Sequence, residues 1–169
     1  MGRFLNRFFA RLNTRFPSLF DRAVKKPEVM TFTDVPWTPF TKPLNKARVA
    51  LVTTAGVHLL GQTPFDMLDR DGDASYRELP SVTPLGDYTI THDYYDHTDA
   101  EKDINIVFPI ERLMELKDAG FIGSVAEVNY GFMGHIDGSH VETLMKKTAP
   151  QVGASLKAKG VDAVILTPG

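Results

Sequence analysis

The chain has 169 residues, of which 43% are hydrophobic and 24% are charged, and this composition predicts a single soluble globular domain. It has no apolar run of about eighteen residues, which a transmembrane helix needs. It also has no cysteine, which excludes disulfides, thiolate metal sites and a cysteine nucleophile within these residues. Because no secretory signal pattern is present, we expect a cytoplasmic protein.

Charge is distributed unevenly along the chain, although the formal net charge is only -2. Residues 1–26 carry seven Lys or Arg residues and one Asp, whereas the remainder carries twelve basic and twenty acidic residues. Since a nucleic-acid-binding surface needs an excess of basic side chains, the acidic body of the protein argues against nucleic acid as a partner.

Residues 1–26 are predicted to form a basic amphipathic helical segment. Phenylalanines and leucines recur there at spacings of three and four, and arginines recur at a spacing of four, until Pro17 ends or kinks the helix. Ser18 and Asp21 predict the cap of a second short helix. Three roles are open for the segment: docking on the protein's own surface or on a partner subunit, peripheral binding to an anionic membrane, and organelle targeting.

A proline-rich connector is predicted over residues 27–47, because four prolines keep such a segment out of a central sheet. The α/β domain then spans residues 48–169. Its first strand is the apolar run Arg48–Thr54, whose composition is typical of a strand buried on both faces of a parallel sheet.

Residues 60–87 show no clear periodicity. Within them Asp69, Asp71 and Asp73 alternate as in a calcium-binding loop, but Gly72 comes two places too early for that motif. The pattern therefore favours a solvated turn over a metal site.

The stretch from Thr89 to Phe108 carries the densest titratable chemistry of the chain. A short apolar run, Tyr88–Ile90, is predicted to be a strand, and it is followed within a few residues by His92, Asp93, Asp96, His97, Asp99 and Asp103. Carboxylates and imidazoles are costly to bury without partners, so this cluster indicates a functional site at the carboxyl end of a strand rather than core.

The remaining elements alternate between helices and strands. A helix is predicted to open at Pro109 and to close at Gly120. It is followed by a strand over Val125–Tyr130, a helix over Ser139–Lys159 broken at Pro150, and a strand over Val161–Leu166. The alternation predicts an α/β fold with three layers and a mostly parallel sheet, of the Rossmann or flavodoxin-like kind, preceded by an amphipathic helix.

In a parallel sheet, all strands end at one edge, so the residues that follow the predicted strands should meet there. We assign acid–base roles to the four histidines among them and substrate contacts to the others: His58, His92, His97 and His135; Thr54, Gly56, Asp93, Asp99, Gly134, Thr167 and Gly169. Two of these histidines, His92 and His97, could bind a metal, but zinc needs at least three protein ligands, so no metal site is assigned.

Several segments of the sequence resemble the selenoprotein B family, which comprises the B components of glycine, sarcosine and betaine reductase and the selenocysteine subunit of D-proline reductase. They are V-A-L-V-T-T-A-G-V-H-L (49–59), P-F-D-M (64–67), T-H-D-Y-Y-D-H-T-D-A-E-K-D-I-N-I-V-F-P (91–109), G-F-M-G-H-I (131–136) and V-I-L-T-P-G (164–169). The resemblance covers roughly residues 34–169 in collinear order and leaves the N-terminal helix out.

In that family, the turn after the last of these strands is followed by selenocysteine or cysteine. The resemblance therefore implies that the nucleophile missing here would be residue 170, and that an in-frame UGA codon has been read as a stop. A naturally short paralogue is the alternative. No cofactor within the chain itself is implied. The resemblance also implies partner subunits, one of which carries a substrate-activating pyruvoyl group, and a thioredoxin-like electron donor.

These observations predict a reductase subunit that cleaves the C–N bond of a small amino acid or amine derivative, although residues 1–169 alone lack the nucleophile. Two other hypotheses are a non-redox module that binds a small molecule or a metal in the histidine-rich pocket, and an interaction subunit held to a membrane or a partner by residues 1–26.

Overall fold

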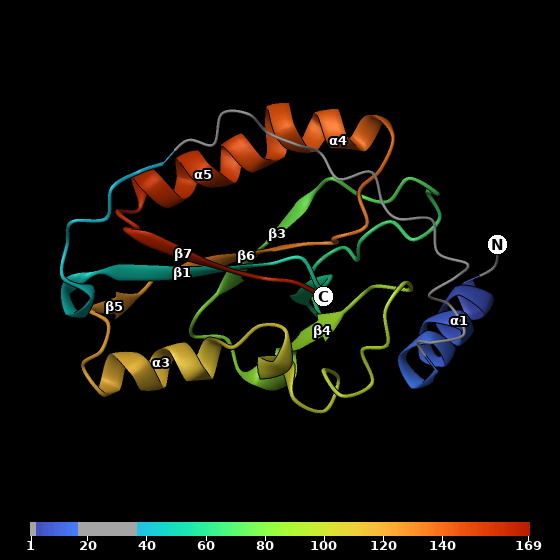
Figure 1. Ribbon diagram of the computed structural model, residues 1–169, viewed down its shortest axis with the longest axis horizontal. Helices are drawn as coiled ribbons and strands as arrows, with labels where there is room; N and C mark the ends of the chain where they lie inside the picture. Colours follow the sequence, from blue (N-terminus) through green and yellow to red (C-terminus); the bar gives the residue numbers. More distant parts are fainter. Residues whose placement is uncertain (1–2, 17–36) are drawn as a thin grey trace.

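A computed structural model describes residues 3–16 and 37–169 (Figure 1). The second predicted helix of the N-terminal segment and residues 27–36 of the connector lie outside the described residues. In the described part of the connector, residues 44–46 form a 3₁₀ turn that leads into the first strand. No helix among the described residues is both long and apolar enough to span a bilayer.

The main sheet is mixed but mostly parallel. Strand β1 (Arg48–Thr53) lies at its centre, with β7 (Ala163–Thr167) parallel on one side. On the other side, β5 (Ser124–Val125) and β6 (Val128–Phe132) pair in parallel with the start and the end of β1. Strand β3 (Tyr76–Pro80) adds antiparallel to β6. The parallel pairing of the first, third and fourth predicted strands is therefore confirmed.

A buried asparagine spans the break between β5 and β6. The side chain of Asn129 accepts a hydrogen bond from the backbone N–H of Leu51 at 2.7 Å. Its amide nitrogen donates to Ser81 Oγ at 2.8 Å and to the Leu79 carbonyl at 3.3 Å. Since unpaired polar groups are costly inside a protein, this side chain maintains the connection between the strands where the backbone ladder is interrupted.

Helices cover both faces of the sheet, because consecutive residues of β1 point to opposite sides. Val49 and Leu51 belong to a core that includes α3 (Ile110–Asp118), and Ala50 and Val52 belong to a core that includes α5 (Ala149–Ala158). Figure 1 shows α5 above the sheet and α3 below it.

The helix predicted over Ser139–Lys159 is divided into three parts. It starts as α4 (Ser139–Thr143), passes through a π-helical turn (Leu144–Thr148) and continues as α5. Pro150 lies in the first turn of α5, directly after the π-helical turn, where the regular α-helical hydrogen-bond pattern is already interrupted.

Two features of the sheets differ from the sequence-based prediction. The run β4 (Tyr88–Ile90) is not part of the main sheet; it pairs antiparallel with β2 (Val57–Leu59) in a separate two-stranded ribbon. Strand β3 lies in the segment where no periodicity was found. Three-residue runs and irregular edge strands carry little local signal, so their partners are decided by the surrounding structure.

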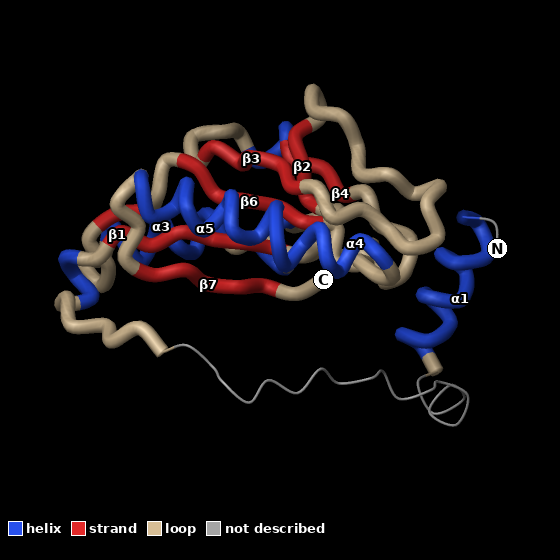
Figure 2. The backbone as a smooth tube through the Cα atoms, turned by 90° about the horizontal axis from the view of Figure 1, so that it is seen from above, coloured by secondary structure: helices blue, strands red, loops and turns tan. Residues whose placement is uncertain are grey.

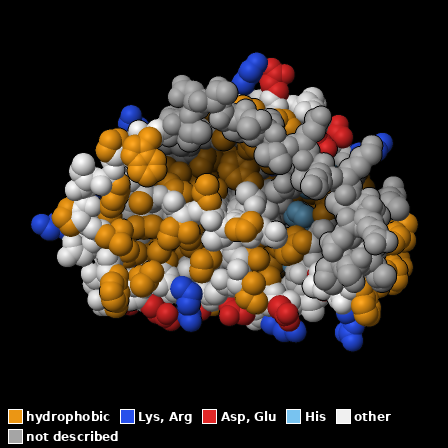
Figure 3. Space-filling model, viewed as in Figure 1, with side chains coloured by type: hydrophobic (Ala, Val, Ile, Leu, Met, Phe, Trp, Pro, Cys, Tyr) orange, Lys and Arg blue, Asp and Glu red, His pale blue; other side chains and the backbone are white. Residues whose placement is uncertain are grey.

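The N-terminal helix α1 (Arg3–Arg15) lies at one end of the molecule, beside the loop that follows β4 (Figures 1 and 2). None of its residues is buried. At the front of the sheet, β7 exposes Val164, Ile165 and Leu166, and apolar side chains gather on this face of the molecule (Figure 3).

Candidate functional site

A cavity of about 270 Å³, here called the terminal cavity, lies at the carboxyl edge of the main sheet. Its lining comes from the ends of β1 and β6, from the loop after β4 and from the residues after β7: Thr54, His92, Tyr94, Tyr95, Gly134, His135, Pro168 and Gly169. The convergence predicted from strand ends therefore brings together Thr54, His92, Gly134, His135 and Gly169.

Backbone contacts hold these strand ends together. The N–H of Thr54 donates to the carbonyl of Thr167 at 2.9 Å. Gly134 has a φ of 90°, and a Cβ at this position would lie 2.1 Å from the Thr54 carbonyl oxygen. Only glycine allows such a close approach in this conformation, so Gly134 sets the position of the following His135.

Gly169 packs against the floor of the terminal cavity. A Cβ placed on it would lie 2.7 Å from the Cα of Ala55 and 3.1 Å from the ring of Tyr95. Tyr95 is itself fixed, because its hydroxyl donates to the Ala55 carbonyl at 3.0 Å. Burial also raises the pKa of this phenol, so it remains protonated and keeps donating.

His92 is held as a neutral imidazole. Burial, and to a smaller extent the neighbouring His135 and His97, lower its pKa to about 4. Its Nδ1 accepts a hydrogen bond from the backbone N–H of Tyr94 at 3.0 Å, which places the proton of the neutral ring on Nε2. At neutral pH, His92 therefore offers the cavity an uncharged N–H donor rather than a cation.

His135 also lines the terminal cavity and is only partly buried. Its Nε2 lies 3.0 Å from the carbonyl oxygen of Arg70, which fixes Nε2 as the donor. The ring packs against Tyr94, with the two ring centroids 4.1 Å apart. This arrangement leaves the Nδ1 lone pair of the neutral ring unengaged by the described residues.

His97 lies behind the cavity wall. Its Nε2 is 3.0 Å from the carbonyl oxygen of His92, and Nδ1 lies 2.8 Å from a carboxylate oxygen of Glu101 without hydrogen-bonding geometry. The ring is buried and contacts Tyr95. The structure thus places His97 where it supports the conformation of the loop that carries His92.

His58, in β2, and Gly56, directly before β2, do not line the terminal cavity. Both ring nitrogens of His58 are engaged, Nδ1 with the Leu59 carbonyl and Nε2 with the Thr91 hydroxyl, each at 2.8 Å. Gly56 has a φ of 75°, and a Cβ there would lie 2.4 Å from the Thr91 carbonyl oxygen. The close approach at Gly56 is therefore to the chain's own backbone.

Three further predicted contact residues face elsewhere. Asp93 is almost fully buried and pairs with Arg3 of α1, whose Nε donates to the carboxylate at 2.7 Å. Asp99 is exposed and accepts a hydrogen bond from Lys102. The hydroxyl of Thr167 donates to the Val107 carbonyl at 2.7 Å, so its side chain points into the sheet edge.

Three lining residues, Tyr94, Tyr95 and Pro168, were not among the predicted site residues. The signal for the two tyrosines was their position between His92 and His97, shortly after a strand, and Pro168 lies between two predicted residues, Thr167 and Gly169. Tyrosine offers both an aromatic surface and a hydroxyl, which suits a partly polar cavity.

The aspartate-rich loop forms hydrogen-bonded turns. Asp73 accepts from the backbone N–H groups of Asp66 and Ser75, and Asp69 pairs with His140 at 3.0 Å. Within residues 3–16 and 37–169, no group of three or more His, Cys, Asp or Glu side chains is arranged to hold a metal ion.

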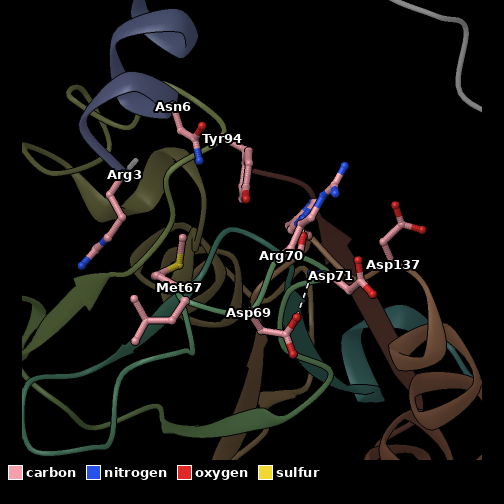
Figure 4. Close-up of a pocket in the computed structure, with 10 residues that line it drawn as sticks. Arg3, Asn6, Met67, Asp69, Arg70, Asp71, Tyr94 and Asp137 are labelled. Atoms are coloured by element: carbon pink, nitrogen blue, oxygen red, sulfur yellow. Dashed lines mark hydrogen bonds between the residues drawn. The ribbon is translucent and has the colours of Figure 1, made fainter. Parts of the chain in front are cut away.

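A second, larger space, here called the outer cavity, adjoins the terminal cavity and shares Tyr94 and His135 with it. It has a volume of about 990 Å³ and lies between α1 and the aspartate-rich loop. In Figure 4, Asn6 of α1 and Tyr94 lie on one side of it, and Arg70, Asp71 and Asp137 lie on the other.

Comparison with known proteins gives a family and several relatives. A model of the glycine/sarcosine/betaine reductase selenoprotein B family matches residues 22–169. The D-proline reductase subunit gamma of Acetoanaerobium sticklandii is 42% identical over 133 residues, which cover 79% of this chain and 53% of that protein. The glycine reductase complex component B subunit gamma of Carboxydothermus hydrogenoformans is 33% identical over 141 residues, 80% of this chain and 31% of that protein.

A third relative, the betaine reductase complex component B subunit beta of Peptoclostridium acidaminophilum, is 33% identical over 133 residues, 75% of this chain and 29% of that protein. The chain thus spans about half the length of the D-proline reductase relative and under a third of the other two. No solved structure matches it significantly. The family match and the shared segments together establish that this chain belongs to the glycine/sarcosine/betaine reductase selenoprotein B family.

Proposed function

We propose that this chain is part of a reductase subunit that cleaves the C–N bond of a small amino acid or amine derivative, of the glycine, sarcosine, betaine or D-proline type. The observation that carries the proposal is the position of Gly169, which shares the terminal cavity with His92 and His135. The family resemblance places a selenocysteine or cysteine directly after this glycine. Such a side chain would start inside a cavity that already contains proton-carrying groups.

Reductive cleavage needs a soft nucleophile at the carbon and a proton for the departing nitrogen. The selenolate or thiolate would supply the electron pair that forms the new bond to carbon, while the C–N pair leaves with nitrogen. Nε2–H of neutral His92 donates a hydrogen bond to an anion in the cavity, which favours the ionised nucleophile without a full positive charge.

The acid role falls to His135. His92 has a pKa of about 4, so it carries no transferable imidazolium proton near neutral pH. His135 is partly exposed and keeps Nδ1 unengaged by the described residues. With a proton on Nδ1 as well as on Nε2, its imidazolium form can transfer the Nδ1 proton to the departing amine, and the ring then takes a proton back from solvent. His97 and Tyr95 act as positioning residues for the loop and for Ala55.

The proposal extends to partners and architecture. Relatives of this chain are subunits or components of reductase complexes. We propose that partner subunits present the activated substrate, that a thioredoxin-like dithiol returns the electrons, and that the reaction takes place in the cytoplasm. The exposed apolar residues of β7 support additional polypeptide on that face. Helices on both faces of the sheet support a three-layer, flavodoxin-like domain.

The gene sequence after codon 169 tests the proposal first. We expect a UGA codon followed by a continuing frame. A UAA or UAG stop without such a frame would contradict the idea of a truncated selenoprotein.

The extended chain then provides the functional test. Expressed with cysteine at position 170 and combined with its partner subunits, it should reduce at least one of the four substrate types with a dithiol as reductant. Alanine at position 170 should abolish the activity. His135→Ala should lower kcat strongly, whereas Asp99→Asn, a change outside the cavity, should leave it unchanged.

A further inference from the structure

Charged side chains of α1 make the ion pairs between this helix and the described residues 37–169. Arg3, Arg7 and Arg11 lie along one stripe of the helix at a spacing of four. They face three acids of the loop after β4: Asp93, Asp96 and Glu101. The phenylalanines lie on other faces, and Phe4 and Phe8 are 84% and 51% exposed. An amphipathic helix that docks for burial would turn its apolar face inward, so this docking is electrostatic.

The three ion pairs differ in strength. Arg3 approaches both oxygens of Asp93, with Nε at 2.7 Å and an Nη at 3.5 Å, and the Asp93 side chain is 2% exposed. The Arg11 contact to Asp96 is 3.8 Å long, and the Arg7 contact to Glu101 is 4.0 Å long. A buried carboxylate depends on its partner far more than an exposed one does, so Arg3 is the principal contact.

The docked helix also forms a wall of the site. Arg3, Asn6 and Tyr94 line the outer cavity (Figure 4), as does His135. Tyr94 and His135 also line the terminal cavity. The two core clusters draw their residues from position 47 onward. The helix can therefore leave its position without removing any side chain from the core.

We infer that the acidic face of the loop, formed by Asp93, Asp96 and Glu101, is a docking surface for an arginine-bearing helix, and that α1 of the same chain occupies it as a movable cover over the outer cavity. Charge complementarity identifies the occupant: three arginines at one spacing meet three acids of a single loop, Arg3 with Asp93, Arg7 with Glu101 and Arg11 with Asp96. The family match begins at residue 22, so α1 lies outside the matched residues. The inference does not depend on the proposed reaction.

Spin-label distances on the full chain test the docking. Because the chain has no cysteine, Asn13→Cys on α1 and Gln151→Cys on α5 give one defined pair of labels on exposed positions. At low ionic strength we expect one narrow distance distribution. Arg3→Gln should broaden it several-fold and shift it to longer distances. High salt should do the same to a smaller extent, because the outer two ion pairs are solvent-exposed.

The matched control is Arg15→Gln, which removes an arginine of the same stripe that makes no ion pair with the described residues. It should leave the distribution unchanged. Arg11→Asp should broaden the distribution, and adding Asp96→Arg to it should restore the narrow distance. If Arg3→Gln and a variant that neutralises Arg3, Arg7 and Arg11 both keep the parent distribution, the inference is wrong.

Two other outcomes would also overturn it. Loss of the narrow distance on dilution with unlabelled chain would assign α1 to a second copy. Arginine-dependent flotation with anionic vesicles, with α1 released from the domain, would assign the stripe to a membrane surface.

The covering role has its own readout, the rate at which diethylpyrocarbonate modifies His135, measured by mass spectrometry against His140 in the same molecule. We expect a several-fold higher rate in Arg3→Gln than in the parent or in Arg15→Gln. An unchanged rate in a variant whose helix is released would show that α1 docks without covering the cavity.

Discussion

His92 and His58 are alike in sequence and in burial, but differ in their partners. Each belongs to or follows a short strand, each is less than 10% exposed, and burial lowers the pKa of each. His58 uses both ring nitrogens for hydrogen bonds inside the β2–β4 ribbon, whereas His92 uses only Nδ1 and lines the terminal cavity. A lowered pKa therefore does not separate a structural histidine from a site histidine, but the engagement of its nitrogens does.

The β2–β4 ribbon and the terminal cavity differ in what they contribute to the site. Gly56 turns the chain out of β1, donating its N–H to Phe132 and accepting from Thr91 through its carbonyl. The ribbon thereby delivers the loop with His92 to the sheet edge, although β4 itself is outside the sheet. The ribbon therefore supports the loop, and the cavity contains the residues for which catalytic roles are proposed.

The largest effect is expected at Gly56. Gly56→Ala should lower the free energy of unfolding by about 4 kcal/mol, because a Cβ would collide with the Thr91 carbonyl at a positive φ. Gly153→Ala in α5 is the matched control, since a Cβ there meets nothing within 4 Å. It should be neutral or raise the free energy by roughly 0.5–1 kcal/mol. Urea denaturation measures the free energy of unfolding of both variants. Equal values for Gly56→Ala and Gly153→Ala would contradict the close approach of Gly56 to the Thr91 carbonyl.

A smaller loss is expected for His58→Ala, about 2–3 kcal/mol, because two buried hydrogen-bond partners lose their bonds and a cavity is left. His135→Ala should cost less than about 1 kcal/mol, since that ring is partly exposed. In the extended chain, His135→Ala should lower kcat more than His58→Ala does. If His135→Ala proved the more destabilising of the two, the division between ribbon and cavity would be wrong.

The pH dependence of stability reports on His92. Its folded pKa of about 4 lies below the ordinary value of 6.5, so the unfolded chain binds more protons between these values. The free energy of unfolding should therefore fall as the pH drops through this window, by roughly 3 kcal/mol from this residue. His92→Gln should flatten the curve, and an NMR titration of the ring should give the pKa directly. An NMR titration midpoint near 6.5 for His92 would contradict the lowered pKa on which its role as a neutral N–H donor rests.

The smallest effect is expected at Asp99, which is exposed and pairs only with Lys102 at the surface. Asp99→Asn should change the free energy of unfolding by less than about 0.5 kcal/mol, as measured by urea denaturation. A loss above about 1 kcal/mol would mean that this carboxylate has a structural role that its present contacts do not show.

Local patterns were sufficient for much of the domain. The apolar run of β1 and the helix bounded by Pro109 and Gly120 were predicted close to their observed bounds. Parallel strands end at a common edge, so the gathering of Thr54, Gly134, His135 and Gly169 followed from chain order alone. His92 reached the same edge by another route, through a ribbon that the sequence did not predict.

The sequence by itself determined the family, the buried strands and the helices that cover them, because apolar periodicity and contiguous motifs are local properties of the chain. Tertiary structure decided the β2–β4 pairing, the neutral state of His92 and the contact of Arg3 with Asp93, ninety positions apart. These features depend on which distant segments come together and how much water they exclude, and neither quantity is encoded in any short stretch of residues.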